Sequence, residues 1–147
     1  MGHCIFCEIA AGRAPASIVA RDDRVCAFLD IQPVNPGHLL VVPVRHAASL
    51  ADLNPEDGAH LFRVAQKLTA AVRHSAVRCE GVTLLLADGK AAGQEVFHVH
   101  LHVIPRFSED GFGFRFGTGY SELPSREDLD RVAASIRAAI EDARPSA

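Results

Sequence analysis

Three histidines, His98, His100 and His102, alternate with apolar residues in the segment FHVHLHV at residues 97–103. Side chains two residues apart along a strand emerge from the same face, so this spacing predicts that the three imidazoles share one face. The pKa of histidine lies near neutrality, so one imidazole can be neutral and attack phosphorus while a protonated neighbour donates to the leaving group. We therefore expect nucleophilic chemistry on this strand.

A glycine-containing loop, DGKAAGQ at residues 88–94, comes directly before the histidines. Gly89 and Gly93 would let backbone amides approach a phosphate closely, and Gln94 adds a neutral side-chain donor. Such a loop alone is equally typical of a plain connection between strands. Beside the histidines it favours a phosphate-binding site.

The three histidines are poorly spaced to hold one catalytic metal ion together. Strand rise is about 3.3 Å per residue, which separates the alpha carbons of His98 and His102 by about 13 Å. A zinc ion with Zn–N bonds near 2.1 Å would take two neighbouring histidines and strain to take all three. A metallohydrolase is therefore disfavoured, and we expect chemistry that requires no metal.

The order of expected strands and helices around these residues predicts an α+β fold, with a five-stranded antiparallel sheet and two main helices. We expect strands within 16–20, 24–30, 38–44 and 82–87, and a histidine strand from about Glu95 to Ile104 that closes at Pro105. One helix should begin after Asn54 and run to about Ala76, and another should begin after Ser125 with an apolar stripe. No repeat or linker interrupts the pattern, so we expect one domain over residues 1–147.

Composition narrows the class of partner. Hydrophobic residues make up 48% of the 147 residues and charged residues 22%, which is typical of a globular protein, and the net charge of −3 disfavours extended nucleic acid. Apolar runs such as HLLVVPV are far too short to span a bilayer, and the N-terminus does not resemble a signal peptide. We expect a cytoplasmic protein that does not bind membranes.

Cys4 and Cys7 form a C-x-x-C pair, which supplies half of a zinc site. His46 and His98 are the candidates for the other two ligands of a structural zinc, with His3 as a competing donor. His3 ranks lower because adjacent residues point apart. Two unmetallated thiols remain the simpler alternative, and a thioredoxin-like redox pair is less expected because no β-α-β unit surrounds the motif.

The segment HVHLHVI matches the His-φ-His-φ-His-φ-φ signature, in which φ is apolar, of the histidine-triad (HIT) superfamily of nucleotide hydrolases and transferases. The segments CIFCEI, AFLDI, GHLLVVPVRH, AGQEVFHVHLHVIPR and DGFGF also resemble bacterial HIT proteins, in the same order. The resemblance implies a homodimer, which the broad apolar stripe expected on the first long helix also favours. Some bacterial HIT proteins similarly hold zinc at such a cysteine and histidine set.

The resemblance also implies roles for individual residues. His100 would be the nucleophile that takes up a nucleoside monophosphate, usually AMP, and His98 would be counted with the catalytic histidines as well as with the zinc ligands. His102 and Gln94 would contact the leaving group or the phosphate, with Gly93 nearby. The remaining implied contacts are His38 in the pocket, Asp30 on the ribose, and Ile5, Phe6 and Ile31 beside the base.

Two residues depart from the family pattern: Asp88 where many relatives carry asparagine, and Glu95 where hydrolases of purine phosphoramidates often carry serine. A carboxylate near a phosphate would repel it unless turned away or protonated. We expect a phosphoramidase or dinucleoside polyphosphate hydrolase type of enzyme, with acyl adenylates as a third substrate class. The alternative is a nucleotide-binding adaptor or sensor with little turnover, although a pure binder has no need of His100.

Overall fold

The computed structural model describes residues 4–142, so the competing donor His3 lies outside the described residues. The chain divides into two compact units, one that ends at Phe112 and one that begins at Gly113. The expectation of one domain over residues 1–147 stays a prediction.

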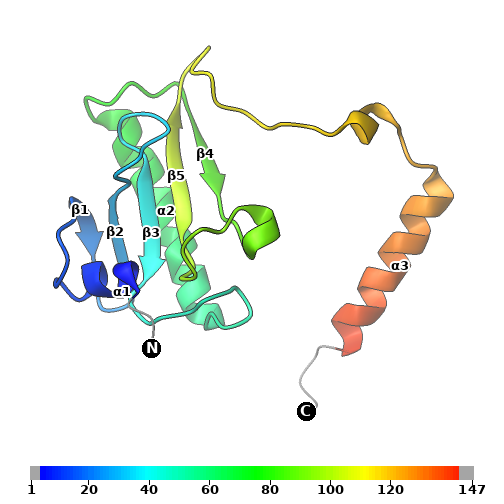
Figure 1. Ribbon diagram of the computed structural model, residues 1–147, viewed down its shortest axis with the longest axis horizontal. Helices are drawn as coiled ribbons and strands as arrows, with labels where there is room; N and C mark the ends of the chain where they lie inside the picture. The colour runs from blue at the N-terminus through cyan, green and yellow to red at the C-terminus, as the bar shows by residue number, and fades with distance from the viewer. Residues whose placement is uncertain (1–3, 143–147) are drawn as a thin grey trace. The chain divides into compact units, whose positions relative to one another are not determined.

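A five-stranded antiparallel sheet forms the first unit, which confirms the predicted α+β class (Figure 1). The strands are β1 (Ile18–Arg21), β2 (Val25–Leu29), β3 (Leu39–Pro43), β4 (Gly81–Leu85) and β5 (Leu101–Arg106). Their order is β1-β2-β3-β5-β4, so β5 lies between β3 and β4 and the sheet is not a simple meander. The histidine segment therefore leads into a central strand.

The long helix α2 (Pro55–His74) covers one face of the sheet, behind the strands in Figure 1. The Asn54 side chain accepts a hydrogen bond from the Glu56 amide at 2.9 Å, which confirms the predicted cap. The buried side chains of α2 are Leu61, Ala65, Leu68 and Val72, and they pack against strand residues such as Val41 and Val103. The apolar stripe of α2 is thus used within the chain, so it gives no support to pairing between copies.

A short helix that was not predicted, α1 (Ile5–Ala10), covers the opposite face. Its side chains Phe6 and Ile9 pack with Phe28 and Leu40 of the sheet. The helix has six residues and its N-cap, Cys4, makes no side-chain capping bond, so the usual signals of a helix start are missing. Packing on the sheet holds α1 in place and brings the cysteine pair to this face.

The histidine strand is shorter than predicted, because β5 begins at Leu101 rather than near Glu95 and continues through Pro105 to Arg106. The His98 amide donates to the Val96 carbonyl at 2.9 Å and the Val99 amide to the Ala47 carbonyl at 2.8 Å, so the preceding segment bends instead of joining the ladder. The register pairs Leu40 with His102, which places His102 on the α1 face of the sheet.

The predicted alternation holds from Val99 onward. Val99, Leu101 and Val103 are buried, and Leu101 and Val103 belong to the cluster under α2. Phe97 breaks the pattern, since 53% of it is exposed. The bend before residue 99 explains this difference, because strand alternation does not apply to the residues ahead of it.

The second unit contains the short 3-10 helix η2 (Thr118–Ser121) and the helix α3 (Arg126–Asp142). The Ser125 hydroxyl accepts from the Asp128 amide at 3.1 Å, which confirms the predicted start of α3. Its apolar side chains Leu129, Val132, Ile136 and Ile140 are exposed. Within residues 4–142, no helix combines the length and the apolar character needed to cross a membrane.

Candidate active site

His100 is held in one tautomer by the backbone of the residue two positions before it. Its Nδ1 lies 2.7 Å from the His98 carbonyl oxygen, which can only accept, so Nδ1 carries the hydrogen and donates. In a neutral ring, Nε2 then keeps a free lone pair. Phe6 packs edge-on against the imidazole, with ring centroids 5.3 Å apart, and helps to fix its plane.

His38 and His102 form a hydrogen-bonded pair next to His100. The Val34 amide donates to His38 Nδ1 at 3.0 Å, so a neutral His38 carries its hydrogen on Nε2. That nitrogen lies 2.9 Å from His102 Nδ1, which must then accept. A neutral His102 consequently carries its hydrogen on Nε2, and the backbone of residue 34 sets the tautomers of both rings.

Both members of this pair are neutral near pH 7. Burial lowers the pKa of His38, with the nearby Asp30 opposing the shift. Burial, and then repulsion from His100 and His38, lowers the pKa of His102 to about 4. In the free protein His102 is therefore an N–H donor without charge, which differs from the protonated neighbour that the sequence led us to expect.

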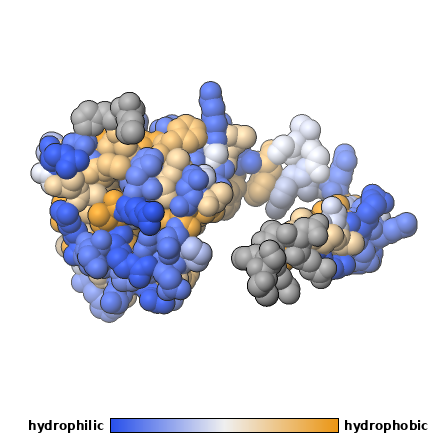
Figure 2. Space-filling model, turned by 90° about the horizontal axis from the view of Figure 1, so that it is seen from below, coloured by the Kyte–Doolittle hydropathy of each residue, from blue (hydrophilic) through white to orange (hydrophobic). Residues whose placement is uncertain are grey.

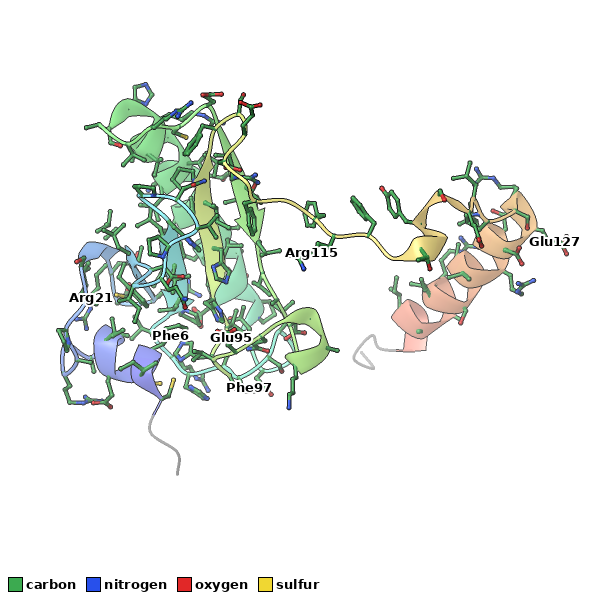
Figure 3. The ribbon with its side chains drawn as sticks, turned by 45° about the horizontal axis from the view of Figure 1, so that its top comes forward. Phe6, Arg21, Glu95, Phe97, Arg115 and Glu127 are labelled. Atoms are coloured by element: carbon green, nitrogen blue, oxygen red, sulfur yellow. The ribbon has the colours of Figure 1, made fainter. Side chains whose placement is uncertain are left out.

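A cavity of about 460 Å³ opens in front of His100 and His102. Of the residues predicted to contact substrate, Asp30, Ile5, Phe6, Ile31 and Gly93 line it. Ile31 is 99% exposed and Ile5 about half exposed, so both lie at the rim, whereas Phe6 is buried in the wall. Phe6 and Glu95 both belong to the lining and lie at the same end of the sheet in Figure 3.

Asp30 borders both the cavity and the histidine pair. One of its oxygens accepts from the Gln32 amide at 2.9 Å, and the other lies 3.7 Å from His38 Nε2. The carboxylate is partly accessible from the cavity, so its second oxygen is available to accept from a hydroxyl group. This position fits a contact with the sugar of a nucleotide.

Gln94 does not line the cavity, which differs from the prediction for this residue. Its amide hydrogens donate to the carbonyls of Ala48 at 2.8 Å and Val96 at 3.1 Å, and its oxygen accepts from the Gly89 amide at 2.8 Å. Both donor hydrogens are thus engaged. Gln94 shapes the loop, which contains the 3-10 helix η1 (Lys90–Ala92), instead of presenting a donor to a ligand.

The two departures from the family pattern take different positions. Asp88 accepts from the Leu50 amide at 2.9 Å and is absent from the cavity lining, so its carboxylate is turned away. Glu95 does line the cavity and its side chain is exposed. The loop reaches the cavity at Gly93, whose left-handed backbone (φ 90°) explains the glycine.

The second cluster of chemical groups contains Cys4, Cys7, His46 and His98, whose ligand atoms all lie within 4.8 Å of one another. His98 Nδ1 lies 3.3 Å from Cys4 Sγ, 3.5 Å from Cys7 Sγ and 3.3 Å from His46 Nδ1. A tetrahedral zinc with bonds of about 2.1–2.3 Å requires ligand separations of roughly 3.4–3.8 Å. The four residues predicted from the sequence therefore fit a zinc ion.

The orientation of His98 supports the same fit. Its Nε2 lies 2.8 Å from the Pro43 carbonyl and donates to it, which leaves Nδ1 without a hydrogen and facing the two sulfurs. Burial, and then the adjacent Cys4, raises the pKa of the Cys7 thiol to about 11. The two neighbouring sulfurs can therefore both be thiolates only when a cation lies beside them. This cluster would supply the ligands for such a cation.

Sequence reasoning missed several residues of the site. The Val34 amide that orients His38 carries no side-chain signal. The apolar wall of the cavity also includes Ile9, Pro15, Ala16, Phe28, Leu29, Leu40 and Val96. Strand alternation offered a signal for Phe28 and Leu40, because the register places both on the same face as His102.

Comparison with known proteins defines the class to which this fold and site belong. A family model described as HIT domain matches residues 11–109. The adenosine 5′-monophosphoramidase hnt1 of Schizosaccharomyces pombe is 35% identical over 138 residues, which cover 93% of this chain and 98% of that protein. The chain is thus similar to HIT proteins over nearly its full length.

Two solved structures agree with this result. The crystal structure of a HIT family member from Bacillus subtilis has a TM-score of 0.85 and 36% identity, and covers 99% of this chain and 100% of that one. A zinc-bound histidine triad family protein from Mycobacterium smegmatis has a TM-score of 0.72 and 38% identity, over 96% and 97% of the two chains. The protein belongs to the HIT family, and membership supports a nucleotide hydrolase or transferase activity in general terms.

Proposed function

We propose that the protein is a hydrolase or transferase of nucleoside monophosphate derivatives, with AMP as the preferred nucleotide, that works through a covalent nucleotidyl group on His100. One observation carries the proposal: the hydrogen bond from His100 Nδ1 to the His98 carbonyl leaves the lone pair of Nε2 free beside the cavity. The S. pombe relative, named as an adenosine 5′-monophosphoramidase, is consistent with this substrate class.

The reaction proceeds in two displacements at phosphorus. His100 Nε2 forms a bond to phosphorus while the bond from phosphorus to the leaving atom breaks, and the electron pair of that bond stays with the leaving atom. Water then attacks phosphorus and releases a proton to solvent, the N–P bond breaks, and its electrons return to Nε2. The His98 carbonyl stabilises His100 throughout. The ring becomes positively charged when it carries the nucleotide, and the hydrogen bond that its Nδ1–H donates to the carbonyl then strengthens.

His102 lines the cavity and supports the first displacement with its Nε2 hydrogen, because its other ring nitrogen is engaged by His38. A leaving group released as a carboxylate needs no proton, whereas one released as an amine needs one. Binding of an anionic phosphate raises the pKa of His102 from its low value. In the complex His102 takes up a proton on Nδ1, which requires the hydrogen bond from His38 to break, and passes its Nε2 proton to the amine.

We also propose that Cys4, Cys7, His46 and His98 hold one structural zinc. The ligand distances and the tautomer of His98 support the site, and the M. smegmatis relative is described as zinc-bound. The ion would tie α1 to β3 and to the segment before β5. Its role is to stabilise the fold around His100, and no step of the displacement passes through it.

A homodimer is the proposed assembly. Among the described strands, β1 and β4 are the edges of the sheet and each pairs with one neighbour, and the second unit exposes the apolar side chains of α3. Apolar surface, orange in Figure 2, is visible on both units in that view. Light scattering over a range of concentrations tests the assembly, and a persistent monomer mass contradicts it.

Turnover of three substrate classes tests the proposed function. Wild-type protein and His100→Ala are incubated with an adenosine phosphoramidate, an acyl adenylate and a dinucleoside polyphosphate, and AMP release is measured by chromatography. The proposal predicts release by the wild type from at least one class, unaffected by chelator added during the assay, and none by the variant. Equal AMP binding by both proteins without release by either would favour an adaptor or sensor.

A further inference from the structure

The charges around the cavity bear on which leaving group the site accepts. Among the described residues that line it, the charged side chains are the carboxylates of Asp30 and Glu95, and none is a lysine or arginine. Lys90 belongs to the same loop as Gly93 but lies outside the lining. A pocket of this charge disfavours a substrate that brings several negative charges.

The two carboxylates are not equivalent. Asp30 accepts from the Gln32 amide and faces His38, so it belongs to the hydrogen-bonded wall. Glu95 forms no hydrogen bond or ion pair with any residue in the described part of the chain, and its side chain is exposed. Its charge is thus free to act on whatever enters the cavity.

The position of Glu95 assigns it to the leaving group. The apolar part of the lining comes mostly from α1, the segment after it and β2, and this part suits the base. In an in-line displacement the leaving group lies opposite the attacking nitrogen. His100 is buried, so a group that departs away from it leaves toward the exposed residues of the lining. Among those exposed lining residues, Glu95 is the charged one.

We propose that Glu95 selects substrates whose leaving group carries a positive charge close to the scissile bond. This inference rests on the proposed function and narrows its substrate class. The preferred substrate is a nucleoside monophosphate joined to an amine or acyl group that also bears a free ammonium. Dinucleoside polyphosphates are disfavoured, because their leaving group carries additional phosphate charges past Glu95.

A matched series of AMP phosphoramidates tests this selection. The three amines are 1,3-diaminopropane, butylamine and β-alanine, whose free ends are cationic, neutral and anionic. The wild type is expected to give kcat/KM in the order cationic, neutral, anionic. Glu95→Gln should lower the ratio between cationic and anionic substrates by roughly tenfold, and Glu95→Lys should invert the order, as expected for one charge at close range.

Two controls separate charge selection from a structural effect. Asp23→Asn removes an exposed carboxylate that is outside the cavity lining and should leave the ratio unchanged. Added salt should compress the ratio in the wild type and have little effect on it in Glu95→Gln, because screening acts on the charge itself. An equal ratio in the wild type, Glu95→Gln and Glu95→Lys overturns the inference.

Binding measurements make failure of the inference distinguishable from failure of the proposed function. Calorimetric titration of His100→Ala with each of the three phosphoramidates measures the charge preference in binding, without turnover. The double variant His100→Ala, Glu95→Gln should show no such preference. Absence of turnover with the binding order intact contradicts nucleotidyl transfer and supports charge selection. Turnover that depends on His100 with no charge order in either measurement contradicts charge selection alone.

Discussion

The backbone carbonyl of His98 accepts the hydrogen bond from His100 Nδ1 at 2.7 Å, while the ring of His98 lies among the sulfurs of Cys4 and Cys7. One residue therefore belongs to both chemical clusters, through its side chain in one and its backbone in the other. Any change that moves the His98 ring also moves the acceptor that sets the tautomer of His100. The proposed zinc site and the proposed nucleophile are mechanically linked at this residue.

Removal of the cysteine pair should cost the protein its metal and much of its stability. We expect about one zinc per chain in protein purified without chelators. The double variant Cys4→Ser, Cys7→Ser should bind none, with a melting temperature lower by roughly 10 °C or more, since structural zinc contributes folding energy and each kcal/mol corresponds to about 2–4 °C at this size. Elemental analysis and calorimetry provide the two measurements.

The control for this experiment is Cys79→Ser. The Cys79 thiol donates to the Gly81 carbonyl and lies outside the cluster, so its replacement should leave the zinc content unchanged. The cysteine double variant should still form the His100 adduct, more slowly. Normal folding without any adduct formation would instead point to a catalytic metal.

The effect of His102→Ala should depend on the leaving group. Turnover of an AMP phosphoramidate with a basic amine should fall by about 10²-fold or more, because the amine leaves only with a proton. Turnover of an acyl adenylate should fall much less, because a carboxylate leaves without one. Rates of AMP release for the two substrates measure the difference, and an equal loss for both would show that His102 acts by binding the phosphate.

Stability should fall as the pH drops from about 6.5 toward 4. The pKa of His102 is lowered to about 4 in the folded protein. Between pH 6.5 and pH 4 this histidine therefore binds a proton in the unfolded chain but not in the folded protein, which favours the unfolded state. Above about pH 6.5 the ring is neutral in both states, and the free energy of unfolding no longer depends on its titration. His102→Gln should therefore show a shallower decrease in urea midpoint over this window than the wild type, and parallel curves would contradict the assignment.

The sequence could predict those parts of the fold that depend on periodic or local interactions. Alternation and caps identified the sheet residues and the starts of α2 and α3, because these signals lie within a few residues of one another. The same reasoning extended the histidine strand too far, since the bend before β5 depends on the Ala47 carbonyl in a distant segment. Gln94 lies outside the cavity lining for a similar reason, because its partner Ala48 comes from that segment too.

The chemical groups were easier to predict than their states. The cysteine and histidine set could be proposed from residue types, and the structure brings all four together. The charge state of His102 could not be predicted, because it depends on burial and on the neighbouring rings of His38 and His100. The role of Glu95 was equally hidden, since the absence of lysine and arginine from the described cavity lining is a property of the folded wall.

The most direct test of the account is a search for the covalent intermediate on His100. Wild-type protein is mixed with an AMP phosphoramidate, quenched in alkali within milliseconds, and analysed by intact-mass and peptide mass spectrometry, with His100→Ala as the control. We expect a transient mass gain of one AMP less one water, mapped to the imidazole of His100, and at least about a 10³-fold loss of turnover in the variant. Turnover at near-native rate by His100→Ala, or an adduct on another residue, would contradict it.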